Sequence, residues 1–151
     1  MSQLRVGSIA TISGTSVLSL NNGILTDPNK PLFYAYNNTG TLPGGQTAQF
    51  NATFINIGGH YSTSLYRFTA PIAGTYWFSC TGLPNTTTGS FFQFMKNGVG
   101  LQYPRAHAMN HDETVTISMP IQLLAGDYVA VYINSDGMEQ TWSGWSGFLI
   151  G

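Results

Sequence analysis

The chain has 151 residues, with only 5 basic and 6 acidic side chains and a formal net charge of −1. Charged residues make up 7% of the chain, against about 25% in an average soluble domain. Five cations cannot form the basic field that attracts nucleic acid or an anionic membrane surface. Because a net charge near zero promotes association, we expect a protein that works in an assembled state.

The length favours a single folded domain, and the N-terminal residues favour synthesis in a cytoplasm. With 42% hydrophobic and 13% aromatic residues, a chain of this size buries a core without covalent staples. The single cysteine, Cys80, excludes an intrachain disulfide, and its place in a predicted strand indicates a buried thiol. No apolar run approaches the roughly 18 residues of a membrane span. Residues 1–6 lack the apolar core of a secretory signal.

The first 28 residues contain almost no aromatic side chains, unlike the remainder. Two apolar-patterned stretches, Leu4–Ile12 and Val17–Leu20, predict an N-terminal β arm over residues 1–28, followed by a main domain over residues 29–151. An arm too small for its own core pairs with its own domain, a neighbouring subunit or a larger partner surface. Its candidate anchoring residues are Leu4, Val6, Ile9, Ile12, Val17 and Leu20.

The main domain shows no helical periodicity. Short β-branched and aromatic runs alternate with Gly, Pro, Asn and Asp turns, which is typical of an all-β sandwich or jelly roll. The predicted strands are Leu32–Tyr36, Thr47–Phe50, Phe54–Ile57, Leu65–Thr69, Thr75–Leu83, Ser90–Lys96, Thr114–Leu123, Tyr128–Ile133 and Trp142–Ile150.

Two of these strands are apolar on both faces. Tyr128–Ile133 and the Tyr76-Trp77-Phe78 segment lack the polar alternation of a half-exposed antiparallel strand. Each is either central to the sandwich or in contact with another subunit. Together with the low charge, this pattern favours contact with a subunit.

Ordered motifs from Lys30 onward resemble the globular head domain of complement component 1q and its tumour-necrosis-factor-like relatives. They are Phe33-Tyr34-Ala35, Arg67-Phe68-Thr69-Ala70-Pro71 continuing to Phe78, Asn97-Gly98, Leu124–Val129 and Trp145–Ile150. The resemblance implies an antiparallel ten-strand jelly roll that forms a compact homotrimer, with aromatic strand faces along the three-fold axis. The candidate core or trimer-interface residues are Tyr76, Trp77, Phe78, Phe92, Phe94, Tyr128, Tyr132, Trp145 and Phe148.

The opening Met-Ser-Gln-Leu-Arg-Val looks like the start of small structural proteins of tailed bacteriophages. This likeness favours a virion protein made in the host cytoplasm: a trimeric decoration or cement protein on a phage head, attached through the arm. The alternatives are the receptor-binding tip of a phage fibre that recognises host surface glycan, and a bacterial extracellular adhesion domain. For glycan stacking the candidates are Trp142, Trp145 and Tyr103-Pro104, although a core or interface role is commoner at strand spacing.

No catalytic motif is present, and we expect neither an enzyme nor a cofactor. His107 and His111, with Asp112 or Glu113, have the residue types of a metal site. A strand connection does not align positions four apart, so we favour an exposed or intersubunit loop and keep metal binding as a minor hypothesis. Asp127, after Gly126, is expected to accept backbone N–H groups in a turn rather than to bind calcium.

Overall fold

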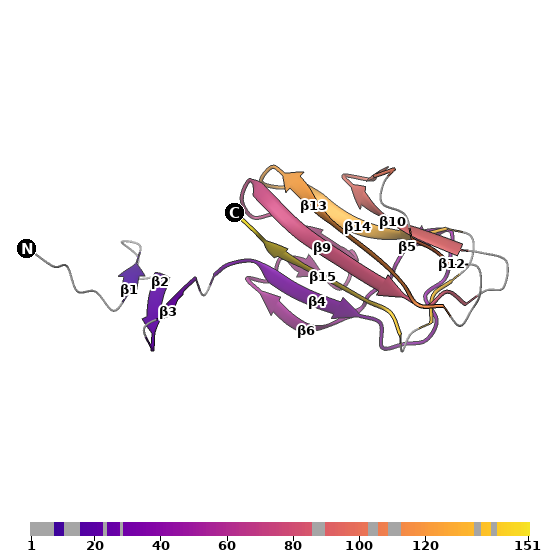
Figure 1. The fold of residues 1–151 in the computed structure, drawn as a ribbon, viewed down its shortest axis with the longest axis horizontal. Coiled ribbons are helices and arrows are strands. Elements are labelled where there is room, and N and C mark those ends of the chain that lie inside the picture. Colours follow the sequence, from indigo (N-terminus) through magenta and orange to yellow (C-terminus); the bar gives the residue numbers. More distant parts are fainter. Residues whose placement is uncertain are drawn as a thin grey trace, which may run out of the picture. The chain divides into compact units, whose positions relative to one another are not determined.

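The computed structural model describes residues 8–10, 16–22, 24–27, 29–85, 90–102, 106–108, 113–134, 137–139 and 142–151. The chain divides into two compact units, Met1–Lys30 and Pro31–Gly151. The described residues contain β-strands and no helix, and hence no helix suited to crossing a membrane (Figure 1).

The first unit is a three-stranded antiparallel sheet of order β1-β2-β3. Its strands are β1 (Ser8–Ala10), β2 (Ser16–Asn21) and β3 (Ile24–Thr26). The turn between β2 and β3 includes Asn22 at a φ of 48°, a left-handed conformation that Asn tolerates. Of the predicted anchoring residues, Ile9, Val17 and Leu20 lie in these strands, while Leu4, Val6 and Ile12 lie outside the described residues.

The second unit packs two sheets face to face. The five-stranded sheet has the order β13-β9-β15-β4-β6. Its strands are β4 (Leu32–Tyr36), β6 (Ala52–Ile57), β9 (Gly74–Gly82), β13 (Val115–Leu123) and β15 (Gly144–Leu149). All neighbouring pairs in this sheet are antiparallel.

The other sheet follows the path β11-β10-β14-β8-β7, with β12 paired to β10 and β5 paired to β14. Its strands are β5 (Gln46–Thr47), β7 (Tyr61–Ser62), β8 (Arg67–Thr69), β10 (Ser90–Lys96), β11 (Val99–Gly100), β12 (Ala106–Ala108) and β14 (Tyr128–Ile133). Figure 1 shows β14, β10 and β5 behind the layer formed by β13, β9, β15, β4 and β6.

Aromatic rings fill the space between the sheets. Trp145 on β15 is fully buried, and its ring meets Phe33 edge-on at 4.9 Å and Tyr61 edge-on at 5.4 Å. Phe33 in turn stacks on Phe68 at 5.2 Å. Such pairs contribute about 0.5–1.5 kcal/mol each beyond the area they bury. The Tyr61 hydroxyl donates to the Phe50 carbonyl at 2.8 Å, so its polar end is satisfied inside the core.

The all-β jelly-roll prediction is confirmed. The bounds of β4, β10 and β14 are those predicted. The described part of the second unit contains twelve strands rather than ten, and three of them (β5, β7 and β11) have only two residues. β7, β11 and β12 were not predicted, because two or three residues are too few to show a periodicity.

Two turns need glycine for different reasons. Asn97 and Gly98 both have positive φ, 51° and 80°, and form a tight hairpin between β10 and β11. Gly74 does not have a positive φ. A Cβ on Gly74 would lie 2.9 Å from Leu149 Cδ1 and 3.1 Å from the Gly151 carbonyl oxygen. Gly74 is therefore needed for close approach of the C-terminal strand.

Gly147 on β15 tests how tightly the sandwich is packed. A Cβ there would lie 2.5 Å from Phe78 Cδ1 and 2.7 Å from Phe33 Cε1. Overpacking of this kind costs about 1–3 kcal/mol. We expect Gly147→Ala to lower the free energy of unfolding by that amount in denaturant titrations, and the neighbouring Ser146→Ala, at a half-buried position, to change it much less. Equal stability of the two variants would contradict this packing.

Candidate functional site

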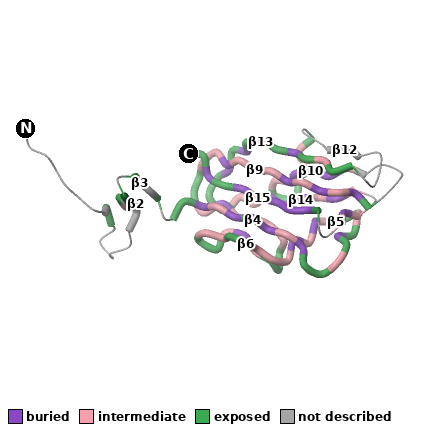
Figure 2. Tube along the Cα trace, turned by 60° about the horizontal axis from the view of Figure 1, so that its bottom comes forward, coloured by how far each residue is buried: buried purple, intermediate pink, exposed green. Residues whose placement is uncertain are grey.

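The outward side of the five-stranded sheet is the candidate functional site. None of its five strands contains Asp, Glu, Lys, Arg or His. Burial alternates along β9 and β13, so one side of the sheet faces the core and the other faces away (Figure 2). We name its apolar part the aromatic face; it consists of Leu32, Tyr34, Tyr36, Phe54, Ile55, Trp77 and Phe148.

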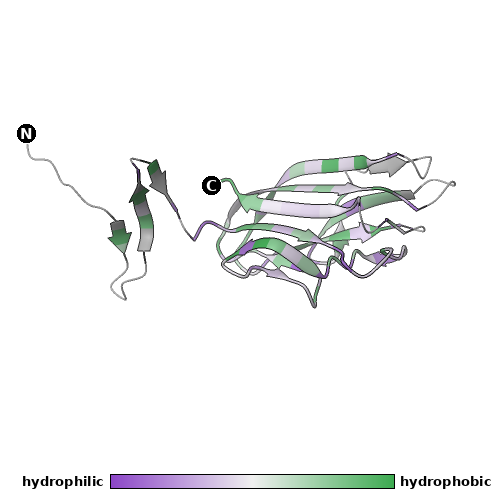
Figure 3. Cartoon of the chain, turned by 90° about the horizontal axis from the view of Figure 1, so that it is seen from below, coloured by the Kyte–Doolittle hydropathy of each residue, from purple (hydrophilic) through white to green (hydrophobic). Residues whose placement is uncertain are grey.

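Strand register brings the members of the aromatic face together. Phe148 is paired with Leu32 on one side and with Trp77 on the other, which places the three in one row across the sheet. In the next row Tyr34 is paired with Ile55. Most residues of these strands are apolar or near neutral in Figure 3, which is coloured by hydropathy.

A β-bulge adds a further aromatic ring to this face. The register between β4 and β6 shifts after Tyr34, and Phe54 is the residue left without a direct partner. Its ring stacks on Tyr36 at 4.2 Å and lies 5.7 Å from the ring of Tyr34. Phe54 is 75% exposed even so. A ring this large and this exposed on a folded surface indicates a contact surface.

Hydroxyl side chains lie on the outward side of β9 and β13, in the same strands as the exposed Pro120 and Gln122. Ser118 Oγ donates to Ser79 Oγ at 2.8 Å, and the Thr81 and Thr116 hydroxyls are also 2.8 Å apart. These hydrogen bonds join β9 to β13 within the chain. Because the hydroxyls are already paired and no charge is present, covering this side of the sheet carries a small desolvation cost.

The structure separates the predicted core or interface residues into two groups. Five are fully or almost fully buried and form the core: Tyr76, Phe78, Phe92, Phe94 and Trp145. Burial also excludes Trp145 from glycan stacking, whereas Trp142 is 63% exposed. Trp77 is half-buried and Phe148 is 42% exposed, and both lie on the aromatic face. Tyr103 and Pro104 lie outside the described residues.

The other two predicted residues, Tyr128 and Tyr132, lie in the second sheet. Both are half-buried on the central strand β14, and the Arg67 guanidinium covers the Tyr128 ring at 4.2 Å. Contacts within the chain therefore explain much of the two-sided apolar pattern of β14. Among the described residues no cation lies over the ring of Trp77 on β9 in this way.

Sequence reasoning missed five residues of the aromatic face: Leu32, Tyr34, Tyr36, Phe54 and Ile55. All five fall in segments that were predicted as strands, but a period of two does not indicate which side of a strand faces the core. A signal was present in Leu32–Tyr36, where every residue is apolar or aromatic, as in the two segments recognised as two-sided.

The histidine hypothesis finds no support among the described residues, where no group of three His, Cys, Asp or Glu side chains is close enough to hold a metal ion. His107 lies on β12, opposite Phe91 of β10. His111 and Asp112 lie outside the described residues.

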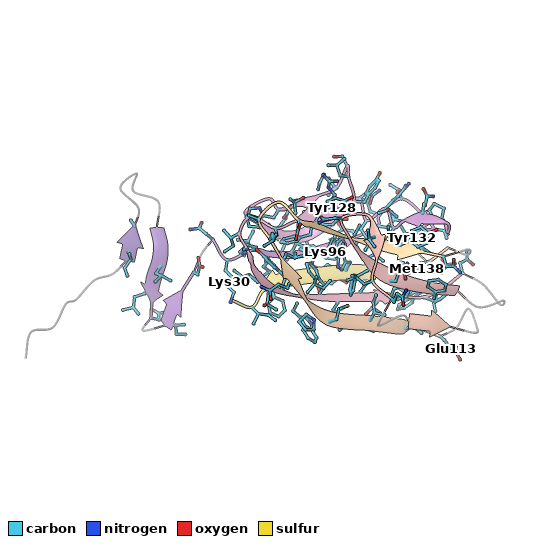
Figure 4. All side chains as sticks on the ribbon, turned by 90° about the horizontal axis from the view of Figure 1, so that it is seen from above. Lys30, Lys96, Glu113, Tyr128, Tyr132 and Met138 are labelled. Carbon is cyan, nitrogen blue, oxygen red and sulfur yellow. The ribbon has the colours of Figure 1, made fainter. Side chains whose placement is uncertain are left out.

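Asp127 is a structural residue, as predicted, and fixes the turn between β13 and β14. Its carboxylate accepts the Leu124 N–H at 2.9 Å and the Asn97 side-chain amide at 2.8 Å. The Lys96 ammonium lies 3.0 Å from the same carboxylate. These contacts, the Asn97 amide first, lower the pKa of Asp127 to about 2. In Figure 4 the labelled side chains of Lys96 and Tyr128 lie close together beside this turn.

The pairing of two antiparallel sheets, with an uncharged outward side on one of them, defines an all-β jelly roll of the C1q and tumour-necrosis-factor type. Residues 32–150 match the C1q domain family, and the chain belongs to that family. The resemblance seen in the motifs of the main domain is thereby confirmed. No curated protein sequence matches the chain.

Solved structures share this fold at low sequence identity. The globular domain of zebrafish complement 1qA protein has a TM-score of 0.66 and 19% identity, over 81% of this chain and 98% of its own. Eiger TNF from S. frugiperda has a TM-score of 0.62 and 9% identity, over 82% and 94%. Murine APRIL has a TM-score of 0.63 and 10% identity, over 80% and 99%. At these identities the likeness concerns the fold alone.

The lowered pKa of Asp127 predicts an acid-sensitive turn. The folded carboxyl takes up its proton near pH 2 and the unfolded one near pH 4. The stabilisation is therefore complete above about pH 4 and is lost as the pH falls toward 2. We expect Asp127→Asn to be less stable than the native chain at pH 7 and to depend less on pH between 4 and 2, in thermal unfolding at a series of pH values. An unchanged pH dependence would contradict this role.

Proposed function

We propose that the chain is a non-enzymatic structural protein whose second unit forms a homotrimer by covering its aromatic face. The observation that carries this proposal is a complete sheet without a charged residue, whose outward side exposes large aromatic rings. Domains of this family often form trimers.

The physical balance favours such contact. Removing apolar surface from water contributes roughly 25 cal/mol per Å². Burying an unpaired charge costs several kcal/mol, and this sheet contains none. The net charge of −1 adds little repulsion between copies. Association through this face therefore gains the apolar term without the usual electrostatic cost.

For the biological role, we propose a decoration or cement protein on a phage head, attached through the arm of residues 1–28. Support comes from the low charge of the chain, from the small apolar sheet in the first unit and from the likeness of residues 1–6 to phage structural proteins. Such a protein stabilises its particle by binding the assembled state only.

Phe148 tests the trimer. It lies in the central row of the aromatic face and is 42% exposed, so its replacement leaves the core intact. Three carboxylates buried at a trimer interface are expected to weaken association at least about 100-fold. Sedimentation should therefore show trimers for the native chain and monomers for Phe148→Asp at micromolar concentration.

The control is Val99→Asp, at an apolar residue on β11 in the other sheet that is 69% exposed. It should remain trimeric. Near-native circular dichroism of both variants ensures that assembly, rather than folding, is compared. A trimeric Phe148→Asp would remove the aromatic face from the interface, and a monomeric native chain would overturn the proposal as a whole.

Copy number tests the role on the particle. A decoration protein is present in hundreds of copies on each head, as counted by quantitative mass spectrometry of purified particles. A few copies at the tail vertex would contradict the cement role. They would favour a fibre tip, for which Trp142, 63% exposed, is the described aromatic side chain available for stacking on a host glycan.

A further inference from the structure

In the small sheet of the first unit, the strand register gathers most of the apolar residues on one face. Ile9 is paired with Leu18, and Leu20 is paired with Leu25. Since Leu18 and Leu20 are two residues apart on β2, all four apolar positions fall on one face of the sheet. The other face carries the row Ser8, Ser19 and Thr26 and the pair Asn21 and Ile24, of which Ile24 is 66% exposed. We name the first the arm face.

Among the described residues of the first unit, none covers the arm face. Ile9 is 51% exposed and Leu20 is 52% exposed. A three-stranded sheet of 3, 6 and 3 residues has no second layer to bury these side chains. Strands this short are stable in water only when such a face packs against something else.

The position of Pro31 in the second unit determines the point from which each arm of a trimer extends. The Pro31 carbonyl accepts the Leu149 N–H at 3.1 Å, so the chain enters the sandwich beside its C-terminal strand. Three-fold symmetry brings the three copies of Pro31 to the same end of a trimer. From Thr26 to Leu32 the chain spans at most about 20 Å, so each arm stays near its own entry point.

We propose that the three arm faces of a homotrimer pack against one another and form a second self-association surface. This proposal rests on the trimer proposed above. Tethering at one end of the trimer gives the arms a mutual concentration in about the millimolar range. The strands β1, β2 and β3 contain no charged residue, so three copies meet without burying an unpaired charge.

A competing surface exists in the second unit. Ile72, Leu124 and Ile150 are exposed on segments that hydrogen bonds join at the end where Pro31 lies. They belong to three separate segments, whereas the arm face is a continuous strand surface. A second strand surface complements it better, because flat apolar sheets pack face to face. Binding of the arm to this end is one outcome of the experiment below.

Single cysteines in adjacent positions of β2 distinguish these arrangements. Leu20→Cys places a thiol on the arm face, and Ser19→Cys places one on the opposite face of the same strand. The native Cys80 is fully buried, and burial raises the pKa of its thiol, so it stays unreactive. The full-length variants are treated with a short bismaleimide at low micromolar concentration and separated on a denaturing gel.

We expect Leu20→Cys to give covalent dimers at least ten times faster than Ser19→Cys, with one chain of each trimer left unlinked. The same thiol in the Phe148→Asp background should lose this advantage, because monomers no longer bring the arms together. Sedimentation of each sample reports its assembly state.

Each contrary result has its own meaning. Trimers in which Leu20→Cys stays unlinked overturn the contact between arm faces and leave the proposed trimer intact; docking on the second unit gives this result. Equal linking of both variants overturns it as well, since it indicates random collisions. If Leu20→Cys is still linked as fast in the Phe148→Asp background, the trimer is not what brings the arms together, and the proposal is overturned. A monomeric native chain overturns both proposals.

Discussion

The five-stranded sheet carries aromatic rings on both sides, and the described residues of the second unit cover only one of them. The inward side meets the second sheet through the rings around Trp145. The outward side carries Trp77, Phe148 and the stacked pair of Phe54 and Tyr36. A half-exposed antiparallel sheet normally alternates apolar with polar residues. The departure from that rule is the constraint on which the proposed association depends.

The packing of β15 in the core also determines which of its side chains face outward. Gly147 lets the rings of Phe33 and Phe78 approach the backbone of β15, which seats Trp145 between the sheets. Phe148, which follows Gly147, must then point outward, because successive side chains of a strand alternate between the two faces of the sheet. A slip of one residue would bury Phe148 and expose Trp145, so tight packing inside fixes the pattern outside.

The sequence was sufficient for the fold class and for the long strands, where aromatic runs end at Gly, Asn and Pro. It was insufficient where structure depends on distant pairing. β14 and β9 are equally two-sided in sequence, yet Arg67 covers the Tyr128 ring of β14 from a neighbouring strand. The exposure of Phe54 depends on a bulge opposite β4, which no local pattern specifies. The site was therefore predicted only at Trp77 and Phe148.

The described charges of the second unit lie in the turns and in the second sheet. Lys96 and Asp127 form an ion pair beside the β13–β14 turn, and Arg67 lies on β8. The two sides of the sandwich thus differ in what they offer to a partner. In the proposed trimer, where copies cover the uncharged sheet, the charges that stay exposed belong to the hydrated surface. In the proposed trimer this asymmetry favours a closed assembly over an open one.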